Sequence, residues 1–148
     1  MPAPTTFSLE FLLFPLLWIV ITFALSSGGW QQLATHYRAA TLPPDADVSL
    51  LGYAKVGWVS YKNVLRAGAC SEGLVLKVFF LFRPFHPPLL IPWQAVGPIQ
   101  STTFLWSTTY SMAISTGSTT SEVLKFTSSV LLTSLRPWVR VLPTNEPV

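Results

Sequence analysis

Residues 11–35 contain no Asp, Glu, Lys, Arg or His, and this uncharged run constrains the fold more than any other feature. A helix rises about 1.5 Å per residue and a hydrocarbon core is about 30 Å thick, so residues 7–28 are long enough to cross a membrane. The run is apolar all round rather than along one stripe, which disfavours a helix buried in a soluble core. We therefore expect an N-terminal tail and transmembrane anchor over residues 1–28.

A cleaved signal peptide is the alternative to a permanent anchor. The segment before the apolar block has no basic residue, and Pro15 lies inside the block, neither of which is typical of a signal peptide. Ala24-Leu25-Ser26 is only a loose match to a cleavage site. The sequence favours an uncleaved anchor and leaves cleavage open.

Charge is distributed unevenly on the two sides of the anchor. All nine Lys and Arg residues follow it, together with five of the six acidic residues, whereas Glu10 precedes the apolar run. The positive-inside rule then predicts a single-pass protein of the cytoplasmic (inner) membrane, with its N-terminus outside and its C-terminal domain in the cytoplasm. The basic residues are scattered, which argues against nucleic acid as a partner. The lone Cys70 cannot form an internal disulfide.

Residues 29–45 are predicted to form a neck and a proline-containing loop between the anchor and the domain. Apolar residues recur at helical spacing from Trp30 to Tyr37, which indicates a short amphipathic helix. Trp and Tyr favour the headgroup layer and a basic residue suits its cytoplasmic edge, so we expect Trp30, Tyr37 and Arg38 at the membrane interface. A helix packed on the domain explains the same spacing equally well.

Residues 46–142 have a strand-like pattern that ends in one helix. Runs of β-branched and aromatic residues between Gly, Pro and Ser predict six or seven short strands. The strands are expected at residues 53–60, 62–69, 74–82, 89–91, 99–107, 109–116 and 122–127. Ser128 or Ser129 is expected to cap a closing helix over residues 130–136. Residues 143–148 are expected to form a flexible tail.

Three stretches, residues 27–34, 72–76 and 82–93 (FRPFHPPLLIPW in the last), resemble a family of small bacterial membrane proteins of unknown function. That family has an N-terminal anchor followed by a pleckstrin-homology-like (PH-like) domain. The resemblance implies a mainly β fold, a partly open barrel of six or seven strands with a C-terminal helix at one end. It implies a membrane location but no activity and no functional residues.

The proline-rich loop at residues 83–88 is the most distinctive candidate for a binding site. Its prolines restrict the backbone, so it would present Arg83, Phe85 and His86, near Lys77, to a partner or a lipid headgroup at low entropic cost. The alternative is structural: His86 would bond to the backbone at a sheet corner, and Phe85 would cover the core.

Catalytic and metal-binding patterns are missing from the sequence. His36, His86, Cys70 and the scattered carboxylates do not have the spacing of a metal site, and Cys70 with His86 has no activating surroundings. Phosphate-binding loops and paired catalytic carboxylates do not occur. We expect no cofactor, no metal and no small-molecule substrate.

These observations predict a non-catalytic binding or scaffold module, acting as an accessory subunit of a membrane complex. Its expected partners are membrane lipids and another membrane protein. The alternative is a sensor of anionic lipid that places Lys62, Arg66, Lys77 and Arg83 near the headgroups. An enzyme has little support in the sequence.

Overall fold

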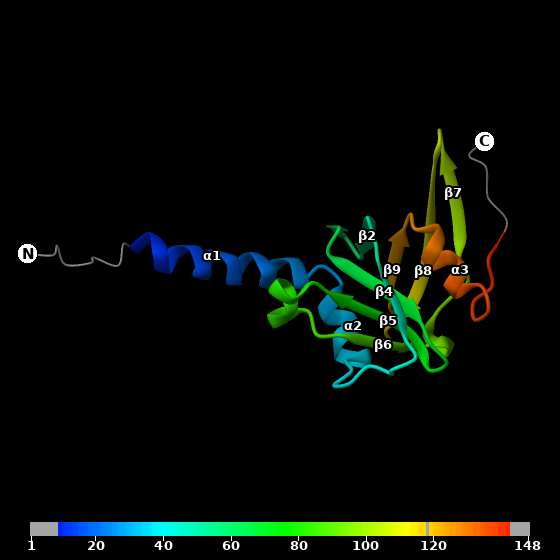
Figure 1. The fold of residues 1–148 in the computed structure, drawn as a ribbon, viewed down its shortest axis with the longest axis horizontal. Coiled ribbons are helices and arrows are strands. Elements are labelled where there is room, and N and C mark those ends of the chain that lie inside the picture. The colour runs from blue at the N-terminus through cyan, green and yellow to red at the C-terminus, as the bar shows by residue number, and fades with distance from the viewer. Residues whose placement is uncertain (1–8, 118, 143–148) are drawn as a thin grey trace, which may run out of the picture.

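The computed structural model describes residues 9–117 and 119–142, so the predicted tail at residues 143–148 lies outside the described part. Helix α1 (Leu9–Ser26) projects as a rod from a β domain (Figure 1). Its 18 residues give a helix about 27 Å long, and its length and apolar composition suffice to cross a membrane. Of its residues, Thr22 and Ser26 alone are buried, so α1 is not the core helix of a soluble domain.

Helix α2 (Trp30–Tyr37) packs into the β domain instead of forming a separate neck. Trp30 and Leu33 are fully buried in the hydrophobic core, and Trp30 is among its largest buried side chains. The predicted helix is therefore present, but its apolar face covers the domain and not the membrane. The hydrophobic core of the domain thus includes residues of the segment 29–45.

Nine strands in the described residues form two antiparallel sheets. The first sheet has the order β1 (Asp47–Leu50), β4 (Leu65–Ala69), β5 (Gly73–Val78), β6 (Leu89–Pro92). The second has the order β3 (Val59–Lys62), β2 (Tyr53–Val56), β9 (Ser121–Phe126), β8 (Ser107–Ser115), β7 (Gln100–Phe104). Helix α3 (Ser129–Leu135) packs near β4. The mainly β class and the C-terminal helix are confirmed, and the two sheets do not close into a barrel.

The core lies between the two sheets and the inner faces of α2 and α3. Strand β3 alternates buried and exposed residues, as expected for a strand with one face toward the core. Strand β5 is buried along almost its whole length, which explains its continuous run of Leu and Val. Its fully buried members are Leu74, Val75 and Leu76.

Several predicted strands are wrong in extent, and two of them show why. Residues 53–60 form a hairpin, because Gly57 takes φ 60° and turns the chain between β2 and β3. The strand predicted at residues 74–82 ends at Val78, and the chain continues into the 3-10 helix η1 (Phe80–Phe85). A second 3-10 helix, η2 (Trp93–Ala95), follows β6.

The C-terminal half agrees closely with the sequence pattern. The predicted hairpin is present as β7 and β8, but its turn is at residues 105–106 and not at residue 108, and β9 lies within one residue of its predicted position. Ser128 caps α3, since its Oγ accepts a hydrogen bond from the backbone N–H of Leu131 at 3.2 Å. Strand β1 was not predicted, because its four residues are only partly buried and show no alternation.

Candidate membrane-contacting site

The joint between α1 and the β domain is tightly packed. The carbonyl of Gly28 accepts a hydrogen bond from the Trp58 N–H at 3.2 Å, which fastens the end of α1 to the β2–β3 turn. A Cβ on Gly28 would overlap Val59, and a Cβ on Gly57 would overlap the Gly28 carbonyl. Glycine is therefore required on both sides of the contact. Trp58, 69% exposed, lies beside this joint at the level where α1 enters the domain.

Phe79 and η1 together form a projection, here called the finger, that lies along the domain-side part of α1. The Trp18 Nε1–H donates a hydrogen bond to the Leu81 carbonyl at 3.3 Å, and the Trp18 ring lies 5.2 Å from that of Phe82. Closer to the domain, the rings of Phe23 and Phe85 meet edge to face at 5.3 Å. In Figure 1 the finger is the green coil beside α1 between β5 and β6. Aromatic contacts thus join the finger to the apolar helix.

A buried network holds the base of the finger. The His86 Nδ1–H donates to the Phe82 carbonyl at 3.0 Å, so the neutral ring accepts the Tyr61 hydroxyl proton at Nε2, 3.1 Å away. The Trp30 Nε1–H donates to the Pro87 carbonyl at 3.0 Å. Burial lowers the pKa of His86, against a smaller opposing effect of its bond to Phe82, and burial raises the pKa of Tyr61. His86 is 1% exposed and fixes the loop; it does not face a partner.

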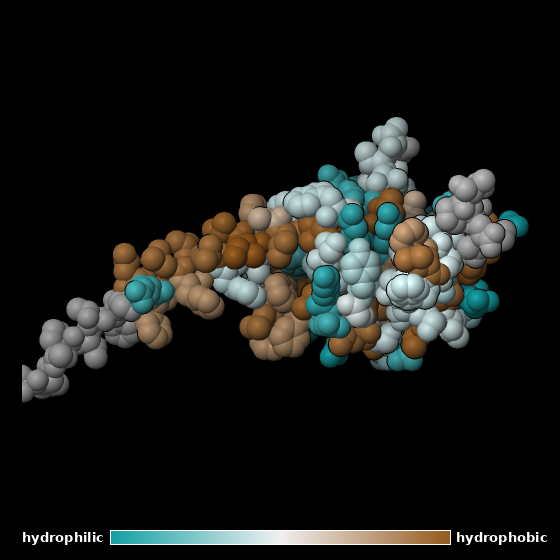
Figure 2. All heavy atoms as spheres, turned by 90° about the horizontal axis from the view of Figure 1, so that it is seen from above, coloured by the Kyte–Doolittle hydropathy of each residue, from teal (hydrophilic) through white to brown (hydrophobic). Residues whose placement is uncertain are grey.

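The end of the finger is apolar and exposed. Phe79, Phe80 and Leu81 are 43%, 61% and 48% exposed, and the rings of the first two lie 4.5 Å apart at a tilt of 55°. Figure 2 shows α1 as a continuous hydrophobic surface, with further hydrophobic atoms gathered where it meets the domain. Sequence reasoning placed these residues inside a strand. The five consecutive apolar residues of 78–82 were the available signal, because they do not alternate.

A cleft of about 180 Å³, here called the cationic cleft, lies next to the finger. It is lined by Arg66, Lys77, Val78, Phe79, Phe80 and Arg83. Arg66 and Lys77 are directly opposite each other on β4 and β5, and η1 supplies Arg83. Lys62, predicted with them, lies on β3 in the other sheet. The structure thus joins three of the four basic residues expected near headgroups.

The remaining predicted site residues have mixed surroundings. Arg38 is exposed and lines a second hollow together with Arg83. Tyr37 is half-buried, and its hydroxyl donates to the Ser115 carbonyl, so it faces the domain. Trp30 is buried, which corrects its prediction as a membrane-interface residue. Phe85 is partly buried against Phe23, and Arg83 is left as the outward-facing member of the proline-rich loop.

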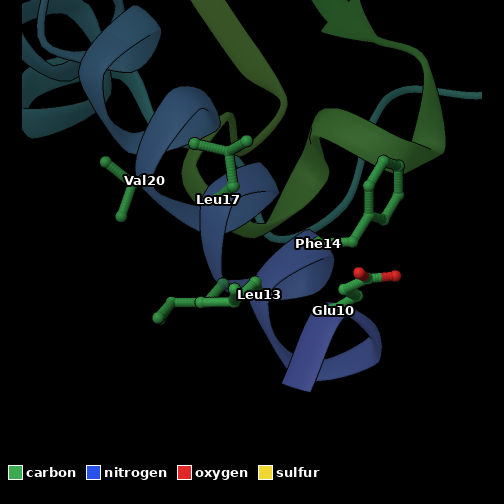
Figure 3. Close-up of a pocket in the computed structure, with 6 residues that line it drawn as sticks. Glu10, Leu13, Phe14, Leu17 and Val20 are labelled. Atoms are coloured by element: carbon green, nitrogen blue, oxygen red, sulfur yellow. The ribbon is translucent and has the colours of Figure 1, made fainter. Parts of the chain in front are cut away.

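No enzyme-like arrangement is found in the described residues. Cys70 is buried and its thiol bonds to the Gly73 carbonyl, at the end of the β5–β6 ladder opposite to the one near His86. Within residues 9–117 and 119–142, no three His, Cys, Asp or Glu side chains lie together so that they could hold a metal. A hollow of about 560 Å³ is formed by α1 alone, and Figure 3 shows its apolar side chains on one open helix face. Such a surface suits lipid chains better than a substrate.

Comparisons with protein-family models, curated proteins and solved structures find no match to this chain.

Proposed function

We propose that this chain is a non-catalytic, single-pass membrane protein whose β domain is a binding module for another membrane protein, as an accessory subunit of a membrane complex. The anchor is uncleaved in this proposal, and the domain lies in the cytoplasm against the inner membrane. The packed Gly28 joint and the contacts of Trp18 and Phe23 with the finger support a domain held at the bilayer. A domain on a loose tether would not need them.

The main support for partner binding comes from the turn between β7 and β8, which exposes three large apolar side chains. Phe104, Leu105 and Trp106, here called the hairpin tip, are 70%, 70% and 91% exposed. Leu105 takes φ 54°, a conformation that is an outlier for a bulky residue and that hairpins usually fill with Gly, Asn or Asp. Retaining large apolar side chains in a strained turn favours a binding role over a folding role.

The position of the hairpin tip favours a protein partner in the same membrane. In Figure 1 the β7–β8 hairpin extends from the domain across the direction of α1, so with α1 spanning the bilayer the tip points sideways and not into it. The strands beside it carry no charged side chain, only Gln and apolar, aromatic and hydroxyl-bearing residues. An uncharged apolar tip suits the core of a protein interface.

A PH-like arrangement and a kinship with small bacterial membrane-anchored proteins are part of this proposal. Two antiparallel sheets followed by a packed C-terminal helix support it. Anionic-lipid sensing, the second candidate, is favoured by a separate observation, namely the three basic side chains of the cationic cleft.

Orientation is tested with a cysteine at exposed Ser60 in a Cys70→Ser background. A membrane-impermeant maleimide is expected to label Ser60→Cys only after the cells are permeabilised, and the mass of the extracted chain is expected to include α1. Labelling in intact cells would place the domain outside. A mass lacking residues 1–26 would show that the anchor is removed.

Partner binding is tested with a photocrosslinking amino acid at position 106 of the full chain in native membranes. We expect one discrete protein adduct, which disappears when the same group is placed at exposed Val130 on α3. In a Leu105→Asn variant carrying the crosslinker at 106, we expect a weaker adduct. Absence of any protein adduct from position 106, or equal adducts from positions 106 and 130, would contradict the proposal.

A further inference from the structure

We infer that the finger is a second membrane-embedded element, and that the cationic cleft beside it binds the phosphate of an anionic phospholipid. This inference rests on the proposed role of α1 as a membrane anchor. It goes further by assigning a lipid class and a depth to a part of the β domain.

The depth follows from the length of α1. Glu10 is the charged residue at its outer end, and the Gly28 joint fixes its inner end, so the 18-residue helix offers about 27 Å for a core of about 30 Å. The whole length of α1 is therefore needed to cross the hydrocarbon core, and no turn of the helix extends into water. Trp18 lies about 12 Å along the helix from Ser26, and its indole bonds to the Leu81 carbonyl. Leu81 is therefore at a depth that the hydrocarbon must occupy.

The alternative is that the finger lies in water and that the hydrocarbon begins only beyond it, toward the N-terminus of α1. Residues 9–17 would then be left to cross the membrane, and they make only about 14 Å of helix. An embedded finger is compatible with its composition, since Phe79, Phe80 and Leu81 expose apolar side chains where they would meet lipid. Backbone groups at that depth need partners. The Leu81 carbonyl has one in Trp18, and the Phe82 carbonyl has one in His86.

The cationic cleft sits at the boundary between this apolar surface and the polar domain. Its lining combines Phe79 and Phe80 with Arg66, Lys77 and Arg83. Among the described residues, no carboxylate forms an ion pair with any of these three cations. A phospholipid supplies both complements in one molecule, because its phosphate meets the cations while its acyl chains lie along the phenyl rings. Free phosphate would leave the apolar half of the site uncovered.

Like charges that face each other across strands are destabilising, so the Arg66–Lys77 pair needs an explanation. The chain contains a second such pair, Lys55 and Lys125, on β2 and β9. That pair does not line the cationic cleft. It therefore provides a control with the same charge and the same antiparallel cross-strand pairing.

Depth is measured with nitroxide labels on the full Cys70→Ser chain in phosphatidylcholine nanodiscs. Labels are placed at Phe80→Cys, at Leu13→Cys in α1 and at Ser60→Cys on the domain surface, all of which are exposed. We expect the labels at positions 80 and 13 to be several-fold more accessible to oxygen, which concentrates in the hydrocarbon, than to a water-soluble nickel chelate. The label at position 60 is expected to be more accessible to the nickel chelate.

The three labels test the membrane anchor α1 and the embedded finger separately. A Leu13 label open to the nickel chelate would overturn the anchor itself. A shielded Leu13 label with a Phe80 label as open as that at Ser60 would leave the anchor intact and overturn the embedded finger.

Lipid class is measured in nanodiscs of phosphatidylcholine that contain a minor fraction of photoreactive phosphatidylglycerol. The Arg66→Gln/Lys77→Gln variant is expected to crosslink about 25-fold less of this lipid, because each of the two basic side chains at the headgroup layer contributes about a fivefold preference. The control Lys55→Gln/Lys125→Gln is expected to match the wild type. Equal losses in both variants, equal labelling of photoreactive phosphatidylcholine, or displacement of the lipid by excess inorganic phosphate would each overturn the assignment.

Discussion

The finger and the hairpin tip are both short, exposed, apolar projections, and their surroundings differ in kind. The finger lies against α1 and beside three basic side chains. The hairpin tip belongs to two strands without any charged residue and extends across the direction of α1. The exposure of apolar side chains does not by itself show whether a surface binds lipid or protein. Our two proposals rest on the neighbouring charge and on the angle to α1: they put the finger in the bilayer and the hairpin tip against a protein.

The largest effect is expected at the joint of Gly28 and Gly57, which fastens α1 to the β2–β3 turn. Gly57→Ala places a methyl group on the Gly28 carbonyl and forces a non-glycine residue to φ 60°, so we expect a loss of about 3 kcal/mol in the free energy of unfolding. Thermal unfolding of the full chain in mild detergent measures it. Gly52→Ala is the control, since its nearest neighbour there is the Asn63 side chain at 3.8 Å. Equal melting temperatures for both variants would show that the joint is not tightly packed.

A smaller effect is expected when the base of the finger alone is weakened. Tyr61→Phe removes the proton donor to His86 Nε2 and leaves a buried acceptor without a partner, which costs about 1–2 kcal/mol. The matched control is Tyr53→Phe, because Tyr53 is only half-buried. The crosslink from position 106 should be retained in Tyr61→Phe. Loss of that crosslink would mean that weakening the finger also impairs binding at the hairpin tip, so that the two projections do not act independently.

The same network predicts a dependence on pH. The pKa of His86 is lowered in the folded protein by burial, so below its ordinary value of 6.5 the unfolded chain binds a proton that the folded one resists. Stability contributed by neutral His86 is thus complete above pH 6.5 and decreases as the pH falls toward the lowered folded pKa. The melting temperature is expected to fall on acidification, and to fall less in His86→Gln. His36→Gln, which changes an exposed histidine, should follow the wild-type curve.

The sequence predicted the elements whose signals are local. Pairing of β7 with β8, the strand β9 and the Ser128 cap all follow from short patterns of β-branched residues and hydroxyls. The same patterns misplaced Trp30, because an amphipathic helix shows that one face is apolar without showing what covers it. The cationic cleft needs Arg66 and Lys77 in register across two strands, and a strand register depends on tertiary contacts.

The finger was missed for a related reason. Phe79 to Phe82 have high strand propensity, and propensity is overridden where the chain leaves the sheet to meet another element. Here that element is α1, which ends some fifty residues earlier in the chain, at Ser26. The sequence contained both partners of the contact between Trp18 and Leu81 but nothing that linked them.

The smallest effect, and the one that sharpens the comparison most, is expected at the hairpin tip. Leu105→Gly/Trp106→Asn places glycine at the central turn residue that takes positive φ, as type II′ hairpins favour, and it relieves the strain of Leu at φ 54°. We expect unfolding to become harder by about 0.5–1 kcal/mol while assembly with the membrane partner is lost. Thermal unfolding and the size of the detergent-solubilised complex measure the two effects. A side chain kept for folding would give the opposite result, with lower stability and an unchanged complex. At the finger, Phe80→Ser is the matched change: it should leave the complex intact and reduce the contact with lipid, since the side chain is already 61% exposed in the protein.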